Sequence, residues 1–497
     1  MLEGDKNVLG CVYIGFEGFG WLYGKPAASK TDANIHSYTP VSGVPTSGIA
    51  TAPSVRLQRP SFSHVLRGAL PFLCALTVTV GLAFNGLNSA TGQAVVAILG
   101  GGMLLTLLLA ERPEEQFWRE RKPVLVPAVL AFAWVCIGAL GVTVSDTPMP
   151  LAPDFAATSL LSWLGSFAAL VCGSILGMKR VRSRKALELV TFFIGMSLLA
   201  GLILHFLDQP SRSSAFWAIS RQGRFAGLIG NVNVTAAVAC GTIILALMMS
   251  ANRLQQGNRS KDMAVALAGF AIAGIALVAA FLTAARFPIV AVMALGVLTL
   301  FLTTRTARGR GRKTYRFGLV FAALACAIGL TSSELLLTRF EAIGTEVAVR
   351  SLMWQHYVSL VLEAPIQGYG PGSFPALNAA SLDNPVLGKT LWYVNSAHNI
   401  VLQLALEGGL PYLALMFLAG LRIARDVLPL IWSGRMSIVF VGVFAMSMQI
   451  LVCALVDIAL DVPASIFLAM FLTGLLWGRG LRLHGRSALR PRMPGNG

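Results

Sequence analysis

The sequence predicts an all-α integral membrane protein that crosses the membrane many times, with about 12 transmembrane helices. Of its 497 residues, 55% are apolar and only 12% are charged, whereas soluble domains carry about 25% charged residues. The apolar residues gather in runs of about 20, the length that crosses a hydrocarbon core of about 30 Å. This composition excludes a water-soluble enzyme, a disordered protein and a fibrous protein.

Twelve apolar runs separated by polar residues predict the individual helices. Each run is long enough to span a membrane. They cover residues 69–85, 92–110, 124–144, 158–178, 188–207, 230–250, 263–282, 287–304, 315–331, 398–421, 436–456 and 462–478.

The distribution of Lys and Arg predicts the orientation. Of the 39 basic residues, 32 lie in the two tails and in alternate connections, and only 7 lie in the other connections. Because cytoplasmic loops are enriched in Lys and Arg, we expect both tails to be cytoplasmic. This placement also explains the net charge of +17 without a nucleic-acid partner.

The seven cysteines contain no CxxC pair, so neither a disulfide framework nor a zinc site is indicated.

Three segments follow from this pattern. Residues 1–65 are rich in Ser, Thr, Pro and Gly over much of their length and predict a disordered cytoplasmic tail. Residues 66–480 form the transmembrane domain, and residues 481–497 form a basic cytoplasmic tail. Within the domain, the outer loop 332–397 is too long for a simple turn, and long loops are usually functional. Apolar residues at helical spacing over 340–363 predict an amphipathic helix in this loop.

Three of the outward-facing arginines are candidates for anion binding, because Arg binds phosphate groups in a planar, bidentate way. Arg224 precedes a predicted helix N-terminus, beside Asn231 and Asn233, and helix N-termini favour anions. Arg286 lies in a very short outer turn. Arg350 and Trp354 are four residues apart on the predicted loop helix and therefore share one face.

A second group of candidates lies where the long loop returns to the membrane. His398 precedes the tenth span, and Asn399, Gln403 and Glu407 follow at four-residue spacing as a polar stripe. Polar residues in a span usually face the protein interior and often mark function. By contrast, Asp457 and Asp461 in another outer turn do not form a convincing metal site.

These residues together resemble the O-antigen ligase and polymerase superfamily, over residues 224–420. Val232, where a proline is common in the family, and Ala285, where a small hydroxyl residue is common, depart from its pattern. The resemblance implies a GT-C-like, metal-independent glycosyltransferase without cofactors in the bacterial inner membrane. Its large loop would be periplasmic. It also implies that Arg224, Arg286, Arg350 and His398 are catalytic and that the other polar candidates bind substrate, namely Asn231, Asn233, Trp354, Asn399, Gln403 and Glu407.

The resemblance also implies the partners. The donor would be a glycan on undecaprenyl pyrophosphate, and membrane lipids would surround the protein. A ligase would transfer the glycan to a sugar hydroxyl of the lipid A core, whereas a polymerase would transfer it to another lipid-linked repeat. A lipid-linked glycan flippase or a transporter is the alternative from another class. It is disfavoured because coupled transporters place ionisable residues near the membrane midplane, and these spans contain almost none.

Overall fold

The computed structural model describes residues 62–141, 151–207, 220–221, 223–256, 260–306, 343–382 and 384–488. Every described residue belongs to one compact unit, Pro60–Gly497. Most of the predicted tail over 1–65 and the whole predicted span 315–331 lie outside the described residues.

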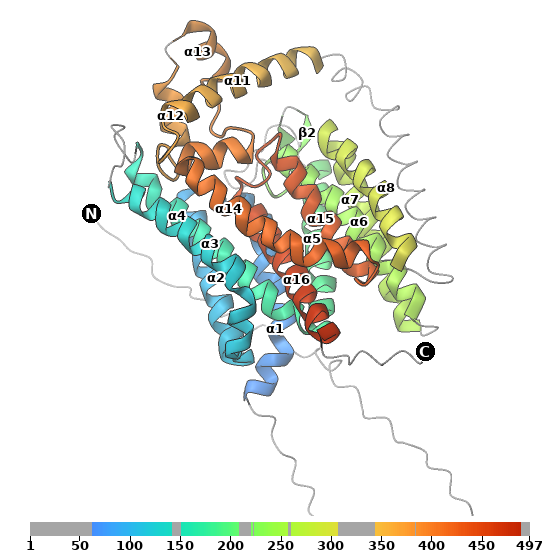
Figure 1. Cartoon of the computed structure of the whole chain (residues 1–497). Coiled ribbons are helices and arrows are strands. Elements are labelled where there is room, and N and C mark those ends of the chain that lie inside the picture. Colours follow the sequence, from blue (N-terminus) through green and yellow to red (C-terminus); the bar gives the residue numbers. More distant parts are fainter. Residues whose placement is uncertain are drawn as a thin grey trace, which may run out of the picture. The chain divides into compact units, whose positions relative to one another are not determined.

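The described residues are almost entirely helical (Figure 1). Ten helices are long and apolar enough to cross a membrane, which confirms an all-α polytopic protein. They are α1 (Phe62–Val80), α2 (Ala90–Glu111), α3 (Glu115–Ala139), α4 (Pro153–Gly177), α5 (Arg180–Leu207), α6 (Val232–Gln256), α7 (Ser260–Thr283), α8 (Arg286–Thr306), α14 (Ile400–Trp432) and α16 (Pro463–Ala488).

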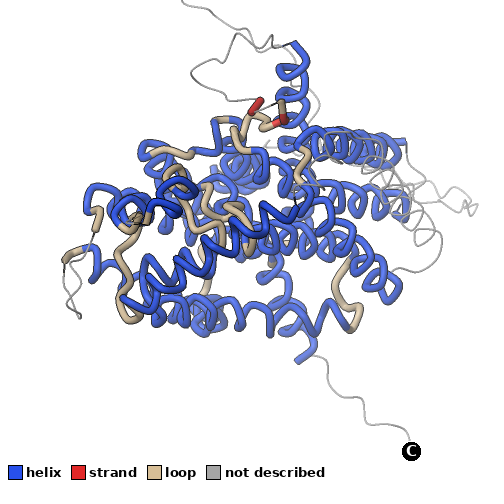
Figure 2. Tube along the Cα trace, turned by 90° about the horizontal axis from the view of Figure 1, so that it is seen from above, coloured by secondary structure: helices blue, strands red, loops and turns tan. Residues whose placement is uncertain are grey.

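The remaining elements are shorter. Helix α15 (Ile438–Ala454) is apolar over its 17 residues, and two 3-10 turns, η1 (Gly81–Ala83) and η2 (Asn85–Leu87), follow α1. Within the described part of the chain, the only strands are β1 (Ser220–Arg221) and β2 (Arg224–Phe225), which form a small antiparallel hairpin (Figure 2). A helix therefore lies over each predicted span that falls on described residues.

Several helices extend beyond the predicted boundaries. Helix α3 begins at Glu115, nine residues before the predicted span, and α16 continues to Ala488, into the predicted tail 481–497. Helix α1 begins at Phe62, inside the predicted tail 1–65. The boundaries were wrong because hydropathy marks only the apolar part of a helix. Lys, Arg and Glu have good helix propensity, so the helices continue into charged sequence.

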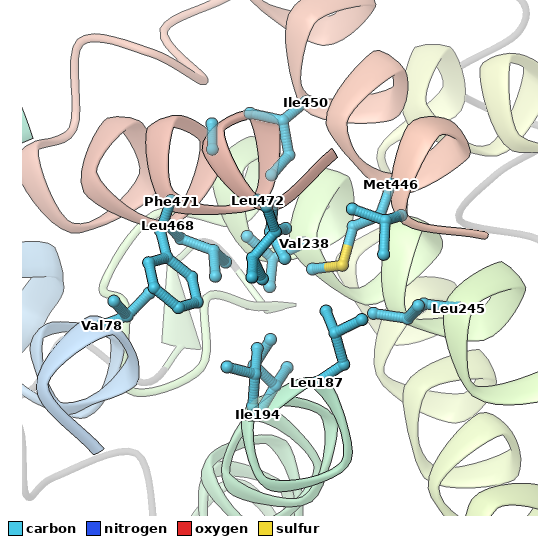
Figure 3. Close-up of a cluster of buried hydrophobic side chains, with 14 of the residues drawn as sticks. Val78, Leu187, Ile194, Val238, Leu245, Met446, Ile450, Leu468, Phe471 and Leu472 are labelled. Atoms are coloured by element: carbon cyan, nitrogen blue, oxygen red, sulfur yellow. The ribbon is translucent and has the colours of Figure 1, made fainter. Parts of the chain in front are cut away.

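The large apolar core joins helices that are distant in the sequence. Figure 3 shows side chains from α1, α5, α6, α15 and α16 meeting at one cluster. Its labelled members include Val78, Leu187, Val238, Met446 and Phe471, all of them buried. Helix α6 is buried along its whole apolar length, so it is surrounded by other helices.

Glycines allow α4 and α16 to pack backbone against backbone. Gly173 and Gly177 on α4 face Gly474 and Gly478 on α16, in the small-xxx-small pattern that brings membrane helices together. A Cβ atom added at Gly474 would lie 2.1 Å from the carbonyl oxygen of Leu170. This close packing holds the middle of α16 directly against α4.

An outer segment between α8 and α14 contains α11 (Ile343–Glu363), α12 (Phe374–Ala380) and α13 (Pro385–Leu391), which lie near one another (Figure 1). It has its own apolar cluster, in which Tyr357 is fully buried. The Tyr357 hydroxyl donates to Oδ1 of Asn378 at 2.9 Å, and Nδ2 of Asn378 donates to two further carbonyls. The predicted helix over 340–363 is therefore present as α11, and its apolar face packs on protein.

A break in α14 anchors this segment. Gly409 has φ +73° and ψ 179° inside the helix, a conformation that glycine adopts without steric cost. The released backbone groups pair with the outer segment: the Leu410 amide donates to the Pro365 carbonyl, and the Tyr369 amide donates to the Leu406 carbonyl, both at 2.7 Å. Two residues of the loop, Pro365 and Tyr369, are thus fixed to the helix that follows it.

The α4–α16 contact predicts the effect of Gly474→Ala. The added methyl group would collide with backbone, and overpacking of this kind costs roughly 1–3 kcal/mol. We expect the free energy of unfolding to fall by that amount in a denaturant titration of the protein in detergent micelles. Gly101→Ala on α2 is the matched control, because no atom lies within 4 Å of its added Cβ. Equal stability of the two variants would contradict the packing.

Candidate functional site

A cavity of about 640 Å³ lies where four outer connections meet. Its described lining contains five of the predicted site residues, Arg224, Asn233, Arg286, Arg350 and His398. They come from β2, the start of α6, the start of α8, α11 and the residues before α14. Apolar residues such as Met353, Val394 and Val456 form much of the remaining wall.

Asp457, in the turn between α15 and α16, joins three of these residues. Its Oδ2 accepts a hydrogen bond from Nδ2 of Asn233 at 2.7 Å and from Nη2 of Arg350 at 3.1 Å. Its Oδ1 lies 3.4 Å from Nδ1 of His398. The side chain of Asp457 is therefore a shared anion for residues from α6, α11 and the α14 entry.

The surroundings of Asp457 favour its ionised form. Burial alone would raise the pKa of this carboxyl, which is only 7% exposed. The hydrogen bond from His398, the amide of Ile458 and the Arg350 charge outweigh burial and hold the pKa below its usual value. A permanent negative charge thus stands beside His398 and Arg350.

Arg224 is held by its own hairpin and by α7. Its Nε donates to the carbonyl of Thr283 at 2.7 Å, and its Nη2 lies 3.5 Å from Oδ1 of Asn233. Oδ1 of Asn231 accepts from the backbone amides of Asn233 and Val234 and so caps α6. Asn231 does not line the cavity.

Arg286 begins α8 directly after a tight turn. Ala284 in that turn has a φ of +48°, and Oγ1 of Thr283 accepts from the amide of Ala285 at 3.2 Å. Nε2 of the buried Gln449 donates to the carbonyl of Pro288 at 2.9 Å. The turn that carries Arg286 is therefore fixed from both sides.

His398 occupies a backbone conformation that is uncommon for a non-glycine residue, with a φ of +50°. Its amide hydrogen-bonds to Oγ of Ser396 at 3.3 Å, and the amide of Ala397 hydrogen-bonds to Oε1 of Gln403 at 2.9 Å. When neutral, a histidine that donates from Nδ1 to Asp457 presents Nε2 as its basic nitrogen. Nε2 makes no hydrogen bond to any residue that the structure describes.

The other predicted residues have different surroundings. Oδ1 of Asn399 accepts from the amides of Val401 and Leu402 and caps α14. Gln403 and Glu407 line a second cavity, and Trp354 packs against the apolar cluster of the outer segment. Of the predicted polar stripe, Gln403 and Glu407 share one face of α14, whereas Asn399 caps the helix, and none of the three lines the arginine cavity.

The arrangement is suited to a multiply charged anion. Three arginines and a histidine line one cavity, and Asp457 is the one acidic residue among its described lining residues. Preorganised cations in a partly apolar cavity stabilise negative charge that develops during a reaction. Among the described residues, no group of three or more His, Cys, Asp or Glu side chains could hold a metal ion.

Asp457 is the functional candidate that sequence reasoning missed. Asp457 and Asp461 are four residues apart in an outer turn, and this spacing alone does not indicate a metal site or another role for either carboxylate. A different signal was present, because an acidic residue in an outer connection is a natural partner for nearby arginines. The pairing with Arg350, 107 residues away in the chain, is visible only in the fold.

Comparison with known proteins agrees with these observations. Residues 271–417 match the family model described as O-Antigen ligase, a segment that includes Arg286, Arg350 and His398. No curated protein matches the chain. The family match confirms the resemblance to the O-antigen ligase superfamily and, with the ten apolar helices, points to a multi-pass bacterial membrane enzyme of the ligase or polymerase type.

Proposed function

We propose that this protein is an inner-membrane glycosyltransferase that transfers a glycan from undecaprenyl pyrophosphate to a sugar hydroxyl of the lipid A core. The observation that carries the proposal is the gathering of three arginines and His398 around Asp457 in one cavity. A pyrophosphate is the kind of anion that several arginines bind. We place the cavity on the periplasmic face, with both termini in the cytoplasm.

In the proposed reaction, the oxygen of the acceptor hydroxyl attacks the anomeric carbon of the donor sugar. The bond between that carbon and the pyrophosphate oxygen breaks, and undecaprenyl pyrophosphate leaves. Arg224, Arg286 and Arg350 stabilise the negative charge that grows on the leaving group. Nε2 of His398 accepts the proton of the hydroxyl, and Asp457 orients the ring through Nδ1 and stabilises the imidazolium that forms.

A polymerase that joins lipid-linked repeats would use the same donor chemistry with a different acceptor. A gel of the lipopolysaccharide from a deletion strain separates these two functions. Glycan that is made but remains unattached supports a ligase. Lipid A core that carries a single repeat supports a polymerase.

The orientation predicts the side on which reporters appear. A periplasmic reporter fused after residue 380 should be active, whereas fusions within 305–316 or after 485 should report the cytoplasm. The reason is the division of the basic residues, 32 against 7. A cytoplasmic reporter signal after residue 380 would contradict the proposed function, because the donor glycan would lie on the opposite side.

The arginine cluster predicts that charge alone is insufficient. Arg224→Lys, Arg286→Lys or Arg350→Lys keeps the charge but loses the bidentate geometry. Because hydrogen bonds to charged groups contribute about 1.5–3 kcal/mol, each variant should lose roughly 10- to 100-fold in kcat/KM. Transfer by purified protein with a purified lipid-linked donor measures this. Arg119→Lys on α3, whose side chain is 74% exposed, is the control, and wild-type transfer by all three variants would exclude the pyrophosphate role.

His398 is expected to act on the proton of the acceptor. His398→Gln keeps a hydrogen-bonding side chain but cannot accept a proton at neutral pH, and general-base catalysis typically contributes ~10²–10⁴-fold. We therefore expect kcat to fall by that factor while donor binding, measured with labelled lipid-linked donor, is retained. Near-normal turnover of His398→Gln would contradict proton transfer. Loss of donor binding would instead assign His398 to the pyrophosphate site.

A further inference from the structure

A second cavity of about 240 Å³ adjoins the candidate site. Asn395 and Ser396 line it, whereas His398, two residues later, lines the arginine cavity. The turn between α15 and α16 is divided in the same way, because Asp457 faces the first cavity and Asp461 lines the second. The two cavities are therefore separated by two short segments of chain.

The second cavity is rich in uncharged hydrogen-bonding groups. Side chains from α2, α4, α14 and the adjoining loops contribute amides, hydroxyls and two carboxylates. The side-chain amides of Asn88, Gln93 and Asn395 make no hydrogen bond to any described residue. The polar lining residues are Asn88, Gln93, Ser159, Ser162, Ser166, Asn395, Ser396, Gln403, Glu407 and Asp461.

The two carboxylates are held in place inside this cavity. Glu407 is buried in α14, and its Oε1 accepts from Nε2 of Gln403 at 2.8 Å. Oδ2 of Asp461 accepts from the hydroxyl of Ser396, which also hydrogen-bonds to the amide of His398. Ser396 therefore links Asp461, in the second cavity, to the backbone of His398, in the first.

Aromatic rings complete the lining. Trp163, Phe155 and Phe374 contribute to the wall, and Trp163 is supported by an edge contact with Tyr412 at 6.2 Å between ring centroids. No Lys or Arg occurs among the described lining residues. The cavity thus combines acceptors and donors for hydroxyl groups with apolar ring surface and lacks the cations that a phosphate would need.

We propose that the second cavity binds one neutral sugar ring of the acceptor and so holds the acceptor beside the segment that carries His398. Sugar hydroxyls both donate and accept, as do the amide and hydroxyl groups here, and the carboxylates accept from hydroxyl donors. The C–H face of a sugar ring is apolar and matches an aromatic wall. The volume suits a single ring, since it is below the range of about 300–1,000 Å³ that is usual for larger ligands. The assignment as acceptor rests on the proposed glycosyl transfer, whereas sugar binding itself does not.

A binding experiment tests the cavity without the reaction. Full-length protein in nanodiscs is titrated with methyl glycosides of a hexose, a heptose and an N-acetylhexosamine, and saturation-transfer NMR detects binding. At least one glycoside should bind to the wild type and equally well to Arg350→Lys. Gln93→Ala and Asn88→Ala, which remove side chains without partners among the described residues, should each weaken binding roughly 3- to 10-fold.

Three outcomes of this titration would overturn the proposal. They are no binding of any glycoside to the wild type, unchanged binding to both alanine variants, and loss of binding in Arg350→Lys but not in the alanine variants. Competition by a divalent cation at the same site, sensitive to Gln93→Ala, would also overturn it in favour of a cation site formed by the two carboxylates.

Transfer kinetics then test the assignment to the acceptor. In Gln93→Ala, the KM for the acceptor should rise while the KM for the lipid-linked donor stays unchanged. A rise in the donor KM alone would overturn the acceptor role. If no transfer occurs with any variant or with the wild type, the proposed function fails, and the glycoside titration still decides whether the cavity binds sugar.

Discussion

The outer face of this protein depends on the carboxylate of Asp457. It is nearly inaccessible to solvent, yet it contacts an arginine from α11, an asparagine from α6 and the histidine before α14. Removing one partner of a buried ion pair typically costs about 3–5 kcal/mol, because the other charge is left uncompensated. Asp457 therefore does two things at once: it links three separate segments, and it determines which nitrogen of His398 faces the cavity.

This carboxylate is positioned by the helices beneath it. The glycine-mediated contact with α4 holds the middle of α16, the helix that follows the Asp457 turn, and α6 lies inside the bundle against α15. The outer segment is attached from the other side, through the backbone pairs at the α14 break near Gly409. Because these contacts are made by backbone and buried apolar groups, the arginines and His398 are attached to rigid elements, as a preorganised site requires.

The sequence was sufficient for the helices and for the arginines and the histidine of the candidate cavity. Apolar runs report burial in a membrane directly, and Arg224, Arg286, Arg350 and His398 all lie on the outer connections that the basic-residue count identifies. Periodicity was less informative for α14. It showed that Gln403 and Glu407 share a face, but which cavity that face lines depends on how α14 packs against α3 and α4. Asn399 lies before the first helical residue, so its side chain turns back to cap the helix. Asp457 was missed because its partners are distant in the chain.

The excess of positive charge in the arginine cavity has a kinetic consequence for the transfer that we propose. A pyrophosphate gains negative charge when its sugar is removed, so the arginines hold the spent lipid carrier more tightly than the loaded one. One carboxylate, already shared among three partners, does little to weaken this attraction. If the transfer is as we propose, departure of the carrier into the bilayer would limit turnover, and spent carrier that accumulates in the membrane would slow the enzyme. Tight retention of the product is the counterpart of strong stabilisation of the leaving group.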